Sequence, residues 1–289
     1  MPNASASWIT RRTIGPPSAM CHQLRWWDPI MIWVISCSRA KLTRARAGSS
    51  SSISCQRAPR SAASCCSSSI DRPSPDVVSL RTTVTTPVTP ATLTRTLTLR
   101  AGQPSLSLSY ELRNVGYLPF DYNWGIHPCL AVRPTWRFDI PATRGVVDEA
   151  GGGLLGQPGD EYTWPVIGGV DLRQAMSADR GVFALHYLTG LTAGWIAATD
   201  TADRRGFGLC FDAGLFPVVW FCLVYGGWRG YYQALVEPWT GYPSPLDEAV
   251  RAGRARILEP GETQHTEVTA VLYDGVDHVT TLNPDGTVC

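Results

Sequence analysis

The sequence predicts an all-β fold, a sandwich of large antiparallel sheets with one or two short helices, for most of its 289 residues. Hydrophobic residues make up 44% of the chain and charged residues only 17%, which is enough apolar material for a sizeable core. Short runs rich in β-branched and aromatic residues recur, and clusters of Gly, Pro and Asp separate them. Many short strands with frequent turns are typical of a sandwich or barrel.

The predicted strands begin with Leu93–Leu99. The next, Leu106–Leu112, alternates apolar and polar residues with a period of two, as expected of a strand with one buried face. Turn-forming clusters lie at 212–214, 226–227 and 283–286. The later predicted strands are Gly181–Leu185, Trp195–Thr199, Phe207–Phe211, Val218–Tyr225, Tyr231–Val236 and Thr266–Tyr273.

One helix has clear start and stop signals. Ser244 is suited to the N-cap, Pro245 to the first helical position, and Asp247 to the first turn. Gly253 is suited to the left-handed residue that ends a helix. These signals predict a short helix over Pro245–Ala252.

The first 76 residues differ in composition from the rest. Residues 1–75 contain ten basic and two acidic residues, sixteen Ser, five of the nine Cys and no Glu. They show neither helical nor strand periodicity, so we expect a disordered basic tail or a wrong-frame translation, which the coding DNA would distinguish. Residues 77–289 are predicted to form one β-sandwich domain, either complete or without its first strands.

Composition also limits the partners and the compartment. The net charge of +1 gives no reason to propose a nucleic-acid partner. No paired Cys-x-x-Cys spacing supports a zinc site, and Cys129, Cys210 and Cys222 are expected to be buried free thiols. The apolar run Ile30–Ile35 is too short to span a membrane and starts too late for a secretory signal. We therefore expect a cytoplasmic protein without membrane association.

Three segments together resemble the aldose 1-epimerase (galactose mutarotase) family. The first runs from Asn114-Val-Gly116 to Trp124-Gly-Ile-His-Pro128, and the second is the strand Tyr231–Thr240, which contains Val-Glu237-Pro-Trp. The third is Leu258-Glu-Pro-Gly-Glu262, followed by a strand. The resemblance covers roughly residues 83–273 and implies a galactose mutarotase-like β-sandwich that requires neither metal nor organic cofactor.

This resemblance implies that His127 is the catalytic acid and Glu237 the catalytic base. Glu237 closes an apolar strand, and Pro238 is expected to leave the sheet directly after it. A carboxyl group at that position is expected to have a raised pKa, although a solvated glutamate is the simpler interpretation. His127 lies between strands among aromatic residues, where a structural histidine is the alternative.

Aromatic and polar side chains could bind the sugar. Indole rings stack on the C–H faces of sugars, although core packing is the commoner role of a tryptophan. Asn123, Tyr225 and Arg229 could supply polar contacts, while a surface arginine is the simpler interpretation of Arg229. The candidate platforms are Trp124, Trp220, Trp228 and Trp239.

The sequence departs from the family before the Asn-x-Gly turn. The family supplies a second histidine and an arginine from that region, and here no matching histidine is present. His186 could substitute, although a strand histidine with satisfied hydrogen bonds is the alternative. We therefore expect an aldose 1-epimerase-like isomerase acting on a small-molecule sugar. The alternatives are a non-catalytic carbohydrate-binding domain of the same fold and a truncated or frameshifted gene product that folds poorly.

Overall fold

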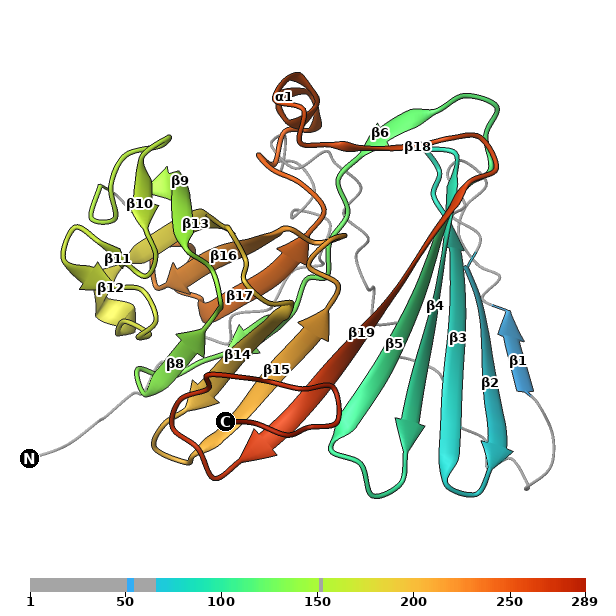
Figure 1. Cartoon of the computed structure of the whole chain (residues 1–289), viewed down its shortest axis with the longest axis horizontal. Helices are drawn as coiled ribbons and strands as arrows, with labels where there is room; N and C mark the ends of the chain where they lie inside the picture. Colours follow the sequence, from blue (N-terminus) through green and yellow to red (C-terminus); the bar gives the residue numbers. More distant parts are fainter. Residues whose placement is uncertain (1–50, 55–65, 151–152) are drawn as a thin grey trace, which may run out of the picture.

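The computed structural model describes residues 51–54, 66–150 and 153–289, and it is built almost entirely of antiparallel strands. Two large sheets dominate (Figure 1). The nine-stranded sheet has the order β1-β2-β3-β4-β5-β19-β15-β14-β8, and the six-stranded sheet has the order β10-β9-β13-β16-β17-β7. The predicted all-β fold class is confirmed.

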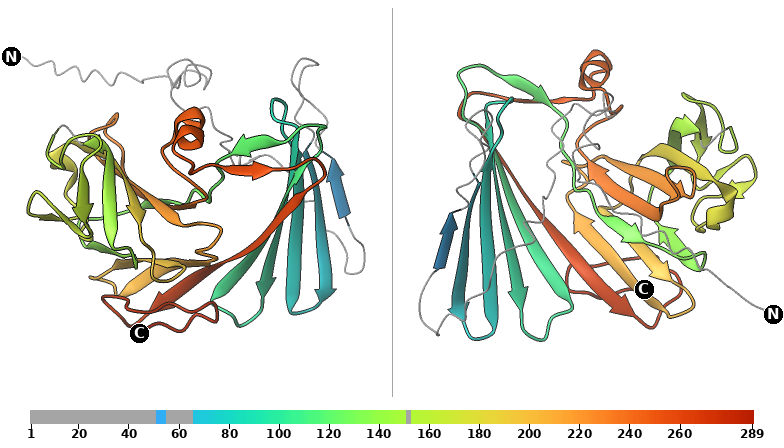
Figure 2. Two further views of the ribbon diagram at one scale, coloured as in Figure 1. Left: turned by 45° about the horizontal axis from the view of Figure 1, so that its top comes forward. Right: turned by 180° about the vertical axis from the view of Figure 1, so that it is seen from behind.

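The nine-stranded sheet is long and strongly twisted. Its β1–β5 half fans out on one side, and its β8–β14–β15 half lies against the six-stranded sheet (Figures 1 and 2). Its strands are β1 (Ser51–Ser54), β2 (Cys66–Ser74), β3 (Val77–Thr85), β4 (Ala91–Arg100), β5 (Ser105–Asn114), β8 (Trp136–Asp139), β14 (Trp195–Asp200), β15 (Arg205–Phe211) and β19 (Thr263–Asp274).

The six-stranded sheet carries most of the later part of the chain. Two short two-stranded ribbons, β6–β18 and β11–β12, complete the strand pairing. The six strands are β7 (Cys129–Ala131), β9 (Arg144–Ala150), β10 (Glu161–Thr163), β13 (Val182–Thr189), β16 (Val218–Tyr225) and β17 (Tyr232–Trp239). The ribbons and helices are β6 (Phe120–Tyr122), β18 (Arg256–Leu258), β11 (Val166–Ile167), β12 (Val170–Asp171), the 3-10 helix η2 (Ala178–Arg180) and α1 (Leu246–Arg251).

The main hydrophobic core lies between the two sheets. Alternate residues of β5, such as Tyr110 and Leu112, point into it, as the period-two pattern predicts. Strand β16 is buried along its whole length, so both of its faces are covered. One face, with Phe221, belongs to the main core, and the other, with Trp220, belongs to a second apolar cluster. That second cluster surrounds the candidate site.

The predicted strands correspond closely to observed ones. Val218–Tyr225 has the predicted limits, and the others extend further than predicted at one or both ends. Strands β13 and β17 also begin one residue later than predicted. The largest difference is at β13, which was expected to end at Leu185 but continues to Thr189.

Strand β17 was expected to end at Val236 but continues to Trp239. The expectation that Pro238 leaves the sheet is wrong, because Pro238 pairs with Val219 of β16 and Trp239 pairs with Val218. On the other edge of β17, the Pro238 carbonyl accepts a hydrogen bond from the backbone N–H of Ile126, 3.0 Å away. The proline nitrogen faces the same side, away from β16, so no hydrogen bond between the two strands is lost.

The predicted helix is present as α1, but its start differs. Pro245 is the N-cap residue rather than the first helical residue, and no side chain caps the helix. The expected Ser244 cap is therefore wrong, because Ser244 lies one residue before the N-cap. Its backbone N–H donates to the Tyr187 hydroxyl at 2.9 Å. At the other end, Gly253 has φ of 66° and follows the helix as predicted.

The N-terminal part of the chain reaches the sheet before the predicted domain start. Strand β2 pairs antiparallel with β3, and most of its side chains are exposed. Predictions for residues 1–50 and 55–65 lie outside the described residues. The domain boundary at residue 77 stays a prediction, although strands β1 and β2 precede it.

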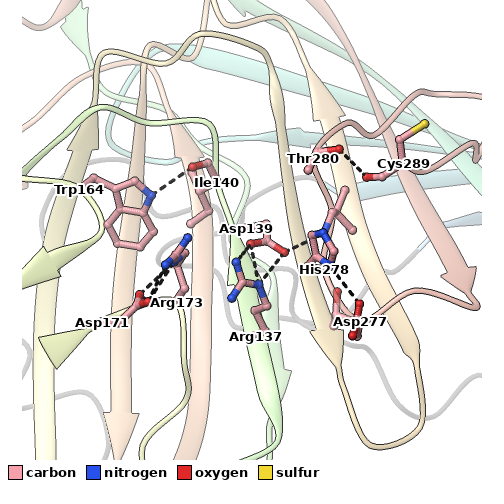
Figure 3. A network of polar contacts seen from close by, with 12 residues as sticks. Arg137, Asp139, Ile140, Trp164, Asp171, Arg173, Asp277, His278, Thr280 and Cys289 are labelled. Atoms are coloured by element: carbon pink, nitrogen blue, oxygen red, sulfur yellow. Dashed lines mark hydrogen bonds and ion pairs between the residues drawn. The ribbon is translucent and has the colours of Figure 1, made fainter.

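A polar network attaches the C-terminal segment to the edge strand β8 (Figure 3). The buried Asp139 carboxylate accepts two hydrogen bonds from Arg137 Nε, at 2.9 and 3.2 Å, and one from the backbone N–H of Val279, at 2.9 Å. Since Val279 lies 140 residues further along the chain, this carboxylate links two distant segments.

Candidate active site

Glu237 lies within an interior stretch of β17. Its register partner on β16 is Trp220, and both side chains point to the same face of the six-stranded sheet. Trp239, two residues further along β17, points to that face as well. The carboxyl group therefore lies in an apolar cluster, with the side chain only 3% exposed.

A loop brings His127 beside this carboxyl group. Strand β7 pairs only with Gln233–Leu235, so the next part of the β17 edge is free for another partner. The segment 124–126 occupies it. The Trp124 backbone N–H donates to Thr240 Oγ1 and its carbonyl accepts from the Thr240 N–H, both at 2.8 Å, while Ile126 donates to Pro238. His127 is the next residue, and it therefore lies opposite Glu237.

The two predicted catalytic side chains are in contact. His127 Nε2 lies 3.3 Å from Glu237 Oε1. The other carboxyl oxygen, Oε2, accepts a hydrogen bond from Trp239 Nε1 at 2.8 Å. The His127 side chain is 38% exposed, so the imidazole is the member of the pair that faces solvent.

Burial shifts the pKa values of Glu237 and His127 in opposite directions. It raises the pKa of Glu237 to about 8, and the indole hydrogen bond from Trp239 only partly offsets this effect. Burial also lowers the pKa of His127 below its usual value, opposed by a backbone hydrogen bond. The raised carboxyl pKa expected from the sequence is present. Both shifts favour the neutral forms, a protonated Glu237 carboxyl beside an uncharged imidazole.

Gly125 is required for the close approach of this loop to β17. A Cβ atom at Gly125 would lie 2.3 Å from Trp239 Cδ2, well inside van der Waals contact. The indole cannot retreat, because it stacks on Trp220 with ring centroids 4.1 Å apart and an interplanar angle of 13°. Gly125 was not among the residues predicted from the sequence, although it lies only two residues before His127.

We predict that Gly125→Ala lowers the free energy of unfolding by about 1–3 kcal/mol, the usual effect of overpacking a tight contact. It should also separate His127 from Glu237. Urea unfolding would measure the first effect. Gly214→Ala is the matched control, since Gly214 is exposed and its added Cβ would meet only the Asp212 side chain, at 3.1 Å. Equal stability of Gly125→Ala and wild type would contradict the prediction.

Further polar groups share this face of the sheet. Burial raises the pKa values of Cys222 and Cys129, and the Glu237 carboxyl contributes to both shifts. Cys210 and Cys222 are buried free thiols as predicted, but Cys129 is exposed, because it lies on the short edge strand β7. Burial also raises the pKa of Asp148, opposed by the Tyr187 hydroxyl.

Three of the four predicted aromatic platforms lie inside the protein. Trp124 packs in the main core against Tyr110 and Phe216. Trp220 and Trp239 stack on each other beside Glu237 and are 1% and 2% exposed. Trp220 and Trp239 therefore lie beside the pair, but neither ring has a face open to a sugar.

The structure separates His186 from the pair. Its register partner on β16 is Phe221, so it points to the main core, on the opposite face of the sheet from Glu237. The ring is fully buried, its Nδ1 lies 3.1 Å from the Tyr162 hydroxyl, and burial lowers its pKa to about 4. Asn123 is also buried, and its amide donates to the Pro243 carbonyl at 3.3 Å.

The other three predicted binding residues lie at the far end of the β16–β17 hairpin. Tyr225 is buried against Tyr232. Trp228 is half-buried in the connecting turn, and the guanidinium carbon of the exposed Arg229 lies 5.2 Å from its ring centroid. Five strand positions separate Tyr232 from Glu237, roughly 17 Å of extended chain. Arg229 and Trp228 are therefore not brought to the pair.

A shallow polar hollow of about 340 Å³ lies elsewhere, beside the network in Figure 3. None of its lining residues was predicted as a site residue; they are Arg137, Gln174, Thr201, Asp277 and His278. Within the described ranges, no three His, Cys, Asp or Glu side chains are grouped as a metal ion would require. The described part of the chain also contains no helix long and apolar enough to cross a membrane.

Sequence comparisons give no match to a protein-family model and no significant match to a curated protein. Solved structures do match. A candidate aldose 1-epimerase from Klebsiella pneumoniae subsp. pneumoniae has a TM-score of 0.57 at 20% identity, covering 72% of this chain and 53% of that one. One from Escherichia coli K12 has a TM-score of 0.54 at 14% identity, covering 71% and 68%.

A protein from Synechocystis matches with a TM-score of 0.53 at 15% identity, covering 72% of this chain and 66% of that one. The chain thus spans about half the length of the Klebsiella protein and about two thirds of the other two. At these identities the comparison shows the fold. The chain has the all-β, galactose mutarotase-like fold of candidate aldose 1-epimerases.

Proposed function

We propose that this chain binds a cyclic sugar, a hexose or a close relative, and interconverts its anomers by acid–base ring opening at His127 and Glu237. One observation carries the proposal. A buried carboxyl and a partly exposed imidazole, 110 positions apart in the sequence, lie 3.3 Å apart on a fold shared with candidate aldose 1-epimerases.

The reaction requires two proton transfers. One group takes the proton of the anomeric hydroxyl while another gives a proton to the ring oxygen, and the cyclic hemiacetal opens to the aldehyde. Rotation about the first carbon–carbon bond then presents the other aldehyde face, and the reverse transfers close the ring. A pair that holds one proton near neutral pH is suited to this cycle.

The protonation of the pair assigns the roles in each half of the cycle. In ring opening, protonated Glu237 gives its proton to the ring oxygen and neutral His127 takes the anomeric proton. In ring closure, His127 is then the acid and Glu237 the base. The family resemblance implies His127 as the acid and Glu237 as the base, and these are their roles in ring closure.

The exposure of the two groups indicates how a sugar would approach. The His127 side chain is partly exposed, whereas that of Glu237 is buried and its Oε1 faces the imidazole. The sugar must therefore replace the direct contact between the imidazole and Oε1, since Trp239 already occupies Oε2.

A non-catalytic carbohydrate-binding domain is the second candidate. It is favoured by the fact that both carboxyl oxygens already have partners within the protein. The described residues also include no second histidine beside the pair, since His186 points to the opposite face of the sheet.

Polarimetry of freshly dissolved α-glucose and α-galactose tests the enzymatic proposal. We expect the wild-type protein to accelerate the decay of optical rotation at micromolar concentration. If the rotation decays at the uncatalysed rate while saturation-transfer NMR detects bound sugar, the binding-domain alternative is correct. If neither rate nor binding is seen with a folded sample, both candidates are wrong.

We also predict a bell-shaped pH profile for mutarotation. The active pair needs a protonated Glu237 and a neutral His127. Activity should therefore fall above a pH of about 8, where Glu237 loses its proton, and fall below the lowered pKa of His127, which is under 6.5. Initial rates in constant-ionic-strength buffers from pH 4.5 to 9.5 would measure this profile. A rate that keeps rising through pH 9 would contradict it.

A further inference from the structure

Trp239 is fixed in place from three sides. Its indole stacks on Trp220, and the backbone of Gly125 packs against the atoms of its five-membered ring. Trp220 is fixed in turn, because its Nε1 donates to the Gly241 carbonyl at 3.0 Å. The strand itself fixes the backbone of Trp239, since its register partner is Val218. The indole N–H therefore has one available direction.

That direction leads to a single carboxyl oxygen. Trp239 Nε1 donates to Glu237 Oε2 at 2.8 Å, while Oε1 faces His127 Nε2 at 3.3 Å. An indole nitrogen is a donor only, so Oε2 must act as an acceptor. In the protonated carboxyl group, the O–H is then best placed on Oε1, where the neutral imidazole can accept it.

We infer that Trp239 is a positioning residue, whose clamped indole N–H holds Glu237 so that its proton lies on the oxygen facing His127. The role of Trp239 in catalysis rests on the proposed function, whereas the hydrogen-bond geometry is independent of that function. It also gives Trp220 and Trp239 a role that differs from sugar stacking and agrees with their burial.

The other titratable groups around the carboxyl are few. His127 faces it from the loop, Cys129 from β7 and Cys222 from β16. Both thiols have raised pKa values and stay neutral at neutral pH. Among the residues that the structure describes, no Arg or Lys forms an ion pair with Glu237. The indole is therefore the fixed hydrogen-bond donor that opposes the effect of burial.

Titration of the Glu237 carboxyl carbon tests the inference without any sugar. In protein labelled with ¹³C-carboxyl glutamate, the Glu237 signal is the one that Glu237→Gln removes. Trp239→Phe keeps an aromatic ring but deletes the N–H, so we expect the midpoint to rise by about one pH unit, because a hydrogen bond favours the carboxylate more than the neutral acid. An unchanged or lower midpoint would overturn the inference.

Trp164→Phe is the matched control. Trp164 is also a buried indole that donates to the protein, through Nε1 to the Ile140 carbonyl at 3.1 Å, but it lies in the main core. Its replacement should leave the Glu237 midpoint unchanged. An equal rise in both variants would mean that loosened packing, rather than the lost N–H, moves the carboxyl, and the inference would be wrong.

A second measurement needs no tryptophan variant that might fail to fold. In the wild-type protein one indole N–H signal should titrate with the midpoint of the Glu237 carboxyl, and the same signal should become insensitive to pH in Glu237→Gln. Absence of such a signal would overturn the inference. Because neither experiment depends on mutarotation, loss of the proposed function and loss of this inference remain distinguishable.

Discussion

Replacing Glu237 with glutamine is expected to slow mutarotation by about 10²–10⁴-fold, the usual contribution of one general acid–base group. The protein should remain folded, because glutamine closely matches the protonated carboxyl. Its carbonyl can accept the Trp239 N–H and its amide can donate to His127 Nε2, which preserves both contacts seen in the structure. The loss would then reflect chemistry rather than packing.

Polarimetric rates, together with circular dichroism to verify the fold, would measure this effect. Glu267→Gln is a suitable control, because Glu267 is exposed on β19, which belongs to the other sheet. It should keep the wild-type rate. A Glu237→Gln variant as active as the wild type would exclude Glu237 from the reaction.

The second large effect concerns stability. Burial raises the pKa of Glu237 from 4.5 to about 8. Below pH 4.5 the carboxyl is protonated in both the folded and the unfolded chain, so it causes no penalty. Between pH 4.5 and 8 only the unfolded chain releases the proton, so the free energy of unfolding falls as pH rises. The total loss above pH 8 is about 5 kcal/mol, at about 1.4 kcal/mol for each pH unit.

Urea unfolding between pH 4.5 and 9 would measure this loss. The glutamine side chain of Glu237→Gln cannot ionise, so this variant should not lose stability in this way as pH rises. Its free energy of unfolding should exceed that of the wild type above pH 8. Parallel curves for the two proteins would show that the carboxyl is ionised at neutral pH in the folded state, and the proposed protonation of the pair would then be wrong.

Much of the architecture follows from the sequence. The period-two pattern of Leu106–Leu112 and the apolar run Val218–Tyr225 each identify a strand, because alternation reports one buried face and an unbroken apolar run reports two. The fold type came from the resemblance of three motifs, and solved structures agree with it. The helix start was missed by one residue, since the Ser-Pro pair does not by itself specify which of the two residues is the N-cap.

The candidate site was less predictable. His127 and Glu237 were singled out by resemblance, and only the tertiary fold brings them into contact. The sequence could not distinguish an exposed tryptophan from a buried one, so Trp124, Trp220 and Trp239 were expected at a sugar-binding surface. The alternating faces of β13 separate His186 from the pair, and that depends on strand register, which a single sequence does not specify.

The loop that carries His127 pairs with β17 where strand β7 no longer does. Backbone hydrogen bonds at the margin of a sheet open more readily than those in its middle. Fraying of this one segment would part the imidazole from the carboxyl while nearly all of the strands stayed paired. The proposed chemistry would then be lost while the β-sandwich stayed folded.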